Sequence, residues 1–575
     1  AVAADGGTAG ASGKGGVCKG GGGLFRGGGG GDGDEVEVDE GGGGAALSID
    51  QLIGLVTALQ EKLELEVRLF QPAFAQYSPS ISEVALEEWG RLFVTQLAPT
   101  LRKHADEGGA KQAQRVTALA EFLPLWRKMS RTQQRFGLLW HGGPFEDALL
   151  PIGPLVDAWC LAQKEAFDGA IKRAAETHAA AGWQRDADNA PHASTAAQLL
   201  EVVAGSIHAF NRMKLPALLV RQWLPRLAHH IDSTLQAYGA IAGLGLPTAD
   251  HISELRAITQ REMTVQGGTA GTWVTAASGW SLAAPFSSLP SLQSQIGTDA
   301  AAQRRVAALA SQFGKLPVAA LCVRACSLLA LSEQLPHLHE LLFFESSSRA
   351  EGWGRPSTPR FEAAALEGDV FHKARQLLHD LAHAIVELIG AKLIFLELRP
   401  AFLQRLYVPS APAADARELL RELNVGLGAA VRCLPREPLR SHAVTAIFRT
   451  CVQAYEMVLL HGGPRRIFEP GDAPVVGRDL TLLQDFFLAR DAHGVPQGVA
   501  WRVVAEATQP LQHVAALMAC PSDELVAQWE RSEGTTRTSD VDEALHRSMV
   551  AQVLAHRPDD LAKRWSARHA RRGSH

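Results

Sequence analysis

The sequence lacks the features of disulfide-rich, membrane-spanning and nucleic-acid-binding proteins. Its seven cysteines are scattered over 575 residues without a Cys-x-x-Cys pair, which favours free thiols in a reducing compartment. No uninterrupted apolar run approaches the roughly 18–20 residues that span a bilayer, and we find no signal peptide. The formal net charge is -5, whereas nucleic-acid-binding domains typically carry a positive net charge on a basic surface. We therefore expect a cytoplasmic protein that binds no nucleic acid.

The alternation of polar and apolar residues that marks β-strands is also nearly absent. Apolar residues instead recur every three or four positions, which places them on one face of a helix. The clearest stripe runs from Leu52 to Phe70 and follows Ser48, a residue suited to cap a helix. Similar stripes occupy residues 199–210, 378–388 and 444–458. Because Ala and Leu are abundant as well, the sequence predicts an all-α fold.

Glycine is concentrated at one end of the chain. Residues 1–46 hold 20 of the 54 glycines and include an acidic patch from Asp32 to Glu40. Such a segment buries too little apolar surface to offset its backbone entropy, so we predict that it is disordered. Its Gly13-Lys14 pair is no phosphate-binding loop, because Thr8 stands in place of the first glycine and Gly15 follows the lysine.

Clusters of Pro and Gly divide the rest of the chain. The longest such region, rich in Gly, Ser, Thr and Ala, predicts a linker over residues 261–300. It separates a helical module at 47–260 from a second module at 301–530. Residues 531–575 are predicted to form a C-terminal helix with a basic tail.

Three patterns resemble catalytic or metal-binding motifs. His379, His383 and Glu387 share one helix face and have metal-ligand spacing, although a solvated polar face explains them more simply. The sequence His-Gly-Gly occurs at 141–143 and 461–463, where glycine after an apolar helix predicts helix termination rather than an oxyanion hole. Cys322 and Cys326 fit core packing. We assign no catalytic residue, cofactor or metal and expect a protein that is not an enzyme.

The segment Leu459-Leu460-His461-Gly462-Gly463-Pro464-Arg465-Arg466-Ile467-Phe468 resembles the second Munc-homology region of plant MUN-domain proteins. That family has an apolar helix followed by Leu-x-Gly-Gly-Pro-x-Arg-x-Phe. Further resemblances occur in the same order along the chain. They are Leu155–Trp159, 192–216, Leu321–Arg324, Ala391–Arg399 with Leu406-Tyr407, Asp479–Phe487 with His493–Pro496, and Val553–Arg557. Glu397 replaces an aspartate of the pattern, and His493 and Val495 are mild departures.

The resemblance covers about residues 120–570 and includes both Munc-homology regions, the C-terminal half of the plant family. It implies an elongated stack of helical bundles, similar to subunits of vesicle-tethering complexes. It also implies a role in exocytosis, with SNARE proteins as partners and peripheral association with the plasma membrane or endomembranes. A helical scaffold subunit without membrane contact is the alternative, and a metal-dependent hydrolase is a remote one.

Two groups of basic residues are candidates for contacts. Arg465 and Arg466 lie in the motif loop and are predicted to touch a protein partner, with the capping of a helix C-terminus as the alternative role of Arg466. The tail is predicted to touch anionic membrane lipids, with a solvated helix end as the alternative. Its residues are Lys563, Arg564, Trp565, Arg568, Arg571 and Arg572.

Overall fold

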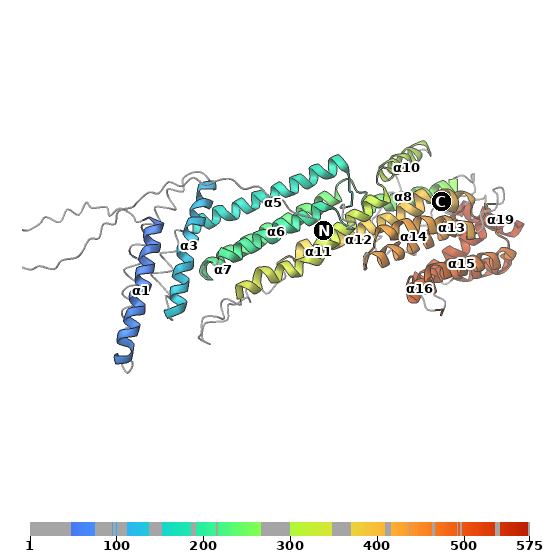
Figure 1. Ribbon diagram of the computed structural model, residues 1–575. Coiled ribbons are helices and arrows are strands. Elements are labelled where there is room, and N and C mark those ends of the chain that lie inside the picture. Colours follow the sequence, from blue (N-terminus) through green and yellow to red (C-terminus); the bar gives the residue numbers. More distant parts are fainter. Residues whose placement is uncertain are drawn as a thin grey trace, which may run out of the picture. The chain divides into compact units, whose positions relative to one another are not determined.

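The helical periodicity of the sequence is realised in the computed structural model (Figure 1). The structure describes residues 48–74, 112–136, 152–185, 191–265, 299–347, 370–408, 416–490 and 493–572, together with Thr95 and Pro99. Within these ranges the positions 214, 216, 436, 463–465, 495–496 and 535–540 are excluded. The predicted disordered segment 1–46 lies outside the described residues.

Helices account for nearly all of the described chain, and no β-strand occurs in those residues. The α-helices are α1 (Ile49–Phe74), α3 (Gln112–Phe136), α5 (Gly153–Ala181), α6 (Ser194–Met213), α7 (Ala217–Gly243), α8 (Ala249–Val265), α10 (Asp299–Gly314), α11 (Val318–Ser347), α12 (His372–Lys392), α13 (Ala416–Cys433), α14 (Leu439–His461), α15 (Ala473–Leu488), α16 (Trp501–Ala519), α17 (Ser522–Gly534), α18 (Val541–Ala555) and α19 (Asp560–Arg572). Two π-helices, η4 (Leu393–Glu397) and η5 (Pro400–Arg405), follow α12, and a 3-10 helix, η6 (Pro470–Asp472), precedes α15. The predicted all-α class is confirmed.

The first helix begins where its capping residue predicts. The Ser48 hydroxyl accepts a hydrogen bond from the backbone N–H of Gln51 at 3.2 Å, and the Gln51 side chain accepts one from the Ser48 N–H at 2.7 Å. This reciprocal pair satisfies two N–H groups that a helix start leaves without partners. The stripe residues Leu52 and Leu63 are buried, as the spacing predicts.

Helix α5 packs against α3, α6 and α7. The predicted stripe of α6 faces inward, with Val203 fully buried, and Phe167 of α5 is fully buried as well. Two polar contacts at the Asp157 carboxylate fix α5 to α7. The indole N–H of Trp223 donates a hydrogen bond of 2.7 Å to it, and the Arg226 guanidinium forms an ion pair with it. Asp157 belongs to the first resemblance motif, so this motif residue has a structural partner.

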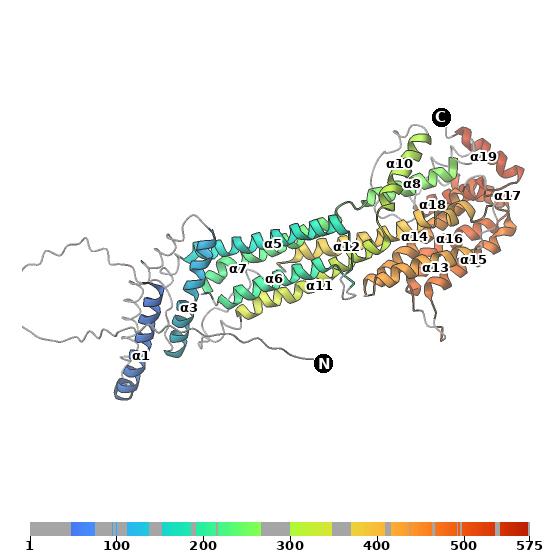
Figure 2. The same ribbon diagram turned by 45° about the horizontal axis from the view of Figure 1, so that its top comes forward.

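Helices α11 and α12 contact helices that lie both earlier and later in the sequence (Figure 2). The α11 helix packs on α6, α7, α12 and α13, and α12 packs on α7, α8, α11 and α14. Most of the predicted linker, residues 266–298, lies outside the described residues, and α8 extends to Val265. The two-module division at 261–300 stays a prediction, and helices on its two sides are in direct contact.

Two helices are long and apolar enough to cross a membrane by length and composition alone. They are Val318–Phe343 within α11 and Leu439–His461, which is α14. Within the most apolar window, 56% of the α11 residues and 72% of the α14 residues are buried inside the fold. Core helices of soluble proteins pass the same test, so the finding is weak evidence for membrane insertion.

Candidate functional site

Four of the sequence segments that carry the resemblance meet at one place in the fold. The end of η5, the segment that follows α14, the middle of α15 and the end of α18 contact one another through hydrogen bonds. We call this place the motif junction and define it by Leu406–Tyr407, 460–462, 466–468, Asp479 and His556–Arg557. These segments are distant in sequence, and the junction therefore holds several helices in register.

Arg466 is the centre of the motif junction and is only 3% exposed. Its guanidinium donates hydrogen bonds to the carbonyl of Leu406 at 2.9 Å and to that of Gly462 at 3.1 Å. A longer contact of 3.5 Å reaches the carbonyl of Phe402. Carbonyls at helix ends have no partner within the helix, and a charged donor with several N–H groups satisfies them well.

Gly462 follows the last residue of α14 and makes room for Arg466. A Cβ atom at this position would lie 2.4 Å from the Val458 carbonyl oxygen and 2.4 Å from Cδ of Arg466. Both distances are shorter than van der Waals contact allows. The second His-Gly-Gly sequence is thus a helix end, as predicted, and its first glycine permits the close approach of the arginine. The first His-Gly-Gly sequence, at 141–143, lies outside the described residues.

His556 joins the end of α18 to the same loop. Its Nδ1 lies 3.0 Å from the carbonyl oxygen of Arg466, and its Nε2 lies 3.2 Å from that of Leu460. The His556 carbonyl in turn accepts a hydrogen bond of 3.0 Å from the N–H of Phe468. The neighbouring ring of His461 is buried, and this burial, with His556 nearby, lowers the pKa of His461 to about 4. His461 is therefore neutral at pH 7.

Tyr407 and Arg557 complete the motif junction. The hydroxyl of Tyr407 donates a hydrogen bond of 2.7 Å to the carboxylate of Asp479, which is 7% exposed. The guanidinium of Arg557 donates to the carbonyl of Cys520 at 2.9 Å, beyond the end of α16. Tyr407 and Arg557 thus each bind a specific group of a different element.

This geometry corrects the prediction that Arg466 contacts a protein partner. Its side chain points into the fold and is engaged by backbone carbonyls, so it offers no surface for a partner. The alternative role, hydrogen bonding at the end of a helix, is the one observed, because the Gly462 carbonyl belongs to the end of α14. Arg465 lies outside the described residues.

The basic tail lies on α19 and has two different faces. Lys563, Arg564 and Arg568 are exposed. Trp565 is only 3% exposed, with its ring centroid 5.2 Å from that of Trp529 on α17. The prediction that Trp565 contacts a membrane is therefore corrected, since its indole is part of the core. Arg571 and Arg572 are helical, and the structure does not describe their side chains.

The predicted polar face of α12 is more than a solvated surface. His379 and Glu387 are exposed, whereas His383 is partly buried and faces His442 of α14, with ring centroids 4.4 Å apart. His442 could not be grouped with these histidines from the sequence, because a residue on another helix has no spacing signal. Cys322 and Cys326 are buried, as predicted for core residues, and the six described cysteines are free thiols.

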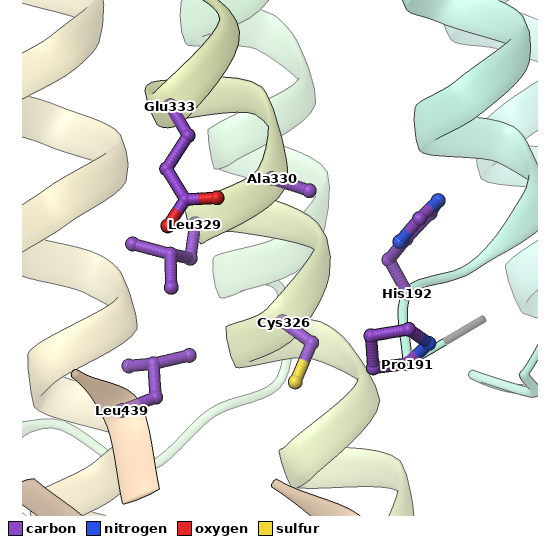
Figure 3. Close-up of a pocket in the computed structure, with 7 residues that line it drawn as sticks. All are labelled: Pro191, His192, Cys326, Leu329, Ala330, Glu333 and Leu439. Atoms are coloured by element: carbon purple, nitrogen blue, oxygen red, sulfur yellow. The ribbon is translucent and has the colours of Figure 1, made fainter. Parts of the chain in front are cut away.

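A small cavity lies between α11, the start of α14 and the segment before α6 (Figure 3). Its volume is about 10 Å³, which is room for a single water molecule and far less than an organic ligand needs. The lining residues are Pro191, His192, Cys326, Leu329, Ala330, Glu333 and Leu439. We therefore place no ligand site there.

The chain matches a known protein family over most of its length. Residues 152–569 match the family described as PATROL1-like, TPR repeats. A curated relative, the Protein unc-13 homolog of Arabidopsis thaliana, is 31% identical over 135 residues, which are 24% of this chain and 12% of the relative. The chain thus matches a small part of that relative's length, and the predicted relationship to plant MUN-domain proteins is confirmed at the level of the family. Because the family match includes the motif junction and most of the chain, the protein belongs to the PATROL1-like, TPR-repeat family.

Proposed function

We propose that this protein is a non-enzymatic membrane-traffic factor that tethers vesicles or assists SNARE assembly during exocytosis. The observation that carries the proposal is the family match over residues 152–569, supported by the similarity to an unc-13 homologue. It acts in the cytoplasm and associates peripherally with the plasma membrane or with endomembranes.

The helical packing supports this kind of activity. A partner helix binds in a groove between helices through apolar residues spaced along one face, and stacked helices provide many such surfaces. The motif junction supplies rigidity instead of contacts, since its arginine and histidine side chains hold backbone carbonyls of η5, α14 and the following loop. The surface that binds a partner therefore lies elsewhere.

The exposed face of α19 is the part proposed to contact a membrane. Lys563, Arg564 and Arg568 lie on this short helix, and the buried Trp565 anchors the opposite side. A basic residue near an anionic surface contributes about 1 kcal/mol, so the three together supply about 3 kcal/mol. This amounts to weak binding that a protein partner on the same membrane strengthens.

The test is co-sedimentation of the full chain with vesicles of phosphatidylcholine alone or with phosphatidylserine, each with and without a membrane-anchored SNARE bundle. We expect binding to the anionic vesicles that increases when the SNARE bundle is present. Changing the three exposed basic residues of α19 to glutamine should weaken lipid binding on the order of 100-fold. A matched control changes three exposed basic residues elsewhere to glutamine. These are Lys172, Arg173 and Arg478.

Three results distinguish the alternatives. Equal weakening by the tail and control variants would contradict a specific membrane face on α19. Binding to the SNARE bundle without lipid dependence would retain the assembly role and remove the membrane contact. Absence of both kinds of binding would contradict the proposal and favour a scaffold subunit of a larger assembly.

A further inference from the structure

Three histidine side chains lie in succession between α12 and α14. His379 and His383 are one helical turn apart on α12, and their ring centroids are separated by 4.3 Å. The ring of His442, near the start of α14, lies 4.4 Å from that of His383. The two helices approach closely farther along, because a Cβ atom at Gly390 would lie only 3.1 Å from the Ala446 carbonyl oxygen. The backbone therefore fixes the distance between the histidines.

The surroundings of these rings favour a cation. Nδ1 of His442 is buried and has no hydrogen-bond partner, which is uncommon for a buried polar atom. The carboxylates of Asp380 and Glu437 are close enough to influence His383 and His442, respectively. A neutral imidazole nitrogen of this kind is the form that binds a metal ion.

We propose that His379, His383 and His442 bind one divalent transition-metal ion of the zinc class, which links α12 to α14. Imidazole nitrogen is a preferred ligand of Zn²⁺, Co²⁺, Ni²⁺ and Cu²⁺, and it does not suit Ca²⁺ or Mg²⁺. Histidines at i and i+4 on one helix recur in zinc sites because both rings project from the same face. Three histidines and a water molecule complete a tetrahedral site.

Binding requires the rings to turn. As the side chains lie, the described residues contain no ready group of three histidine, cysteine or acidic ligands around one point. With Zn–N distances of about 2.0–2.1 Å and tetrahedral angles, ring centroids would lie about 5 Å apart, close to the observed 4.3 and 4.4 Å. His379 is exposed, so its side chain turns without disturbing the core.

The test is isothermal titration of the full chain, prepared without a polyhistidine tag, with ZnCl₂ and separately with CaCl₂. We expect one Zn²⁺ per chain, a rise in Tm with Zn²⁺ and no response to Ca²⁺. The variants His379→Ala and His442→Ala should each weaken binding more than about 100-fold, since loss of an outer partner alone costs 10–100-fold. Co²⁺ should give the visible absorption of a tetrahedral nitrogen site in the unchanged chain, and this absorption should be lost in His379→Ala and His442→Ala.

Two controls locate the site. His372→Ala removes an exposed histidine of the same helix that lies outside the cluster. His546→Ala breaks another close histidine pair, in which Nε2 of His513 lies 2.8 Å from Nδ1 of His546. Both controls should bind Zn²⁺ with the original affinity. The proposal is overturned by unchanged binding in His379→Ala and His442→Ala, by loss of binding in His546→Ala, or by absence of stoichiometric Zn²⁺ binding in the unchanged chain.

Discussion

Replacement of Arg466 by methionine should loosen the motif junction while keeping the apolar part of the side chain. The change removes two well-formed hydrogen bonds, to Leu406 and Gly462, and a longer contact to Phe402. A hydrogen bond from a charged donor contributes about 1.5–3 kcal/mol, and each buried carbonyl left without a partner costs about 1–3 kcal/mol. Removing a buried charge offsets part of this loss. We therefore expect the junction to lose about 3 kcal/mol of local stability.

Hydrogen exchange measured by mass spectrometry detects this loss directly, because the whole chain need not unfold in one step. Amides of the segment 456–470 should exchange on the order of 100-fold faster in Arg466→Met than in the unchanged protein. The same replacement at Arg478, an exposed residue of α15, is the matched control and should leave exchange unchanged. Equal exchange in Arg466→Met and Arg478→Met would refute the argument that Arg466 holds the junction.

Three further predictions concern the same region. Gly462→Ala places a Cβ atom 2.4 Å from the Val458 carbonyl oxygen, so it should lower the free energy of unfolding, measured with denaturant, by about 1–3 kcal/mol. Unchanged stability would contradict the close approach. Burial lowers the pKa of His461 to about 4, so the folded state keeps this ring neutral. The resulting stability is fully present above about pH 6.5, the pKa of an unfolded histidine. It amounts to about 3 kcal/mol and is lost as the pH falls toward 4. Denaturation at pH 7 and pH 4.5 should therefore show less acid sensitivity in His461→Gln, and equal sensitivity would argue against a buried neutral ring. Tyr407→Phe removes the donor to the buried Asp479 carboxylate and should lower the free energy of unfolding by about 1.5–3 kcal/mol, whereas a neutral effect would mean that water replaces the hydroxyl.

The helices and their inward faces were predictable because they depend on spacing within one segment. Ser48 and the stripe beginning at Leu52 needed only local rules of capping and periodicity, and both are observed. The end of α14 at His461 followed from the glycine after an apolar helix in the same way. Such features depend on neighbours that the sequence itself places nearby.

The roles of single polar residues were not predictable, since they depend on contacts between distant segments. Arg466 was predicted to touch a partner because it lies in the motif loop, yet it binds carbonyls just beyond the ends of η5 and α14. Trp565 was grouped with the basic residues beside it in sequence, whereas the helix turns it toward Trp529. His442 joins the α12 histidines only through the packing of two helices.

The position of α11 and α12 has a consequence for how the protein is made. The α6 helix ends at Met213, but α11, which covers part of its apolar surface, ends at Ser347. At a synthesis rate of roughly 5–20 residues per second, the nascent chain carries that uncovered surface for on the order of ten seconds. Val203 and Ile207 lie on the inward stripe of α6. We therefore expect the emerging chain to need shielding of this apolar surface on the ribosome, and slow translation between these helices would lengthen its exposure to aggregation.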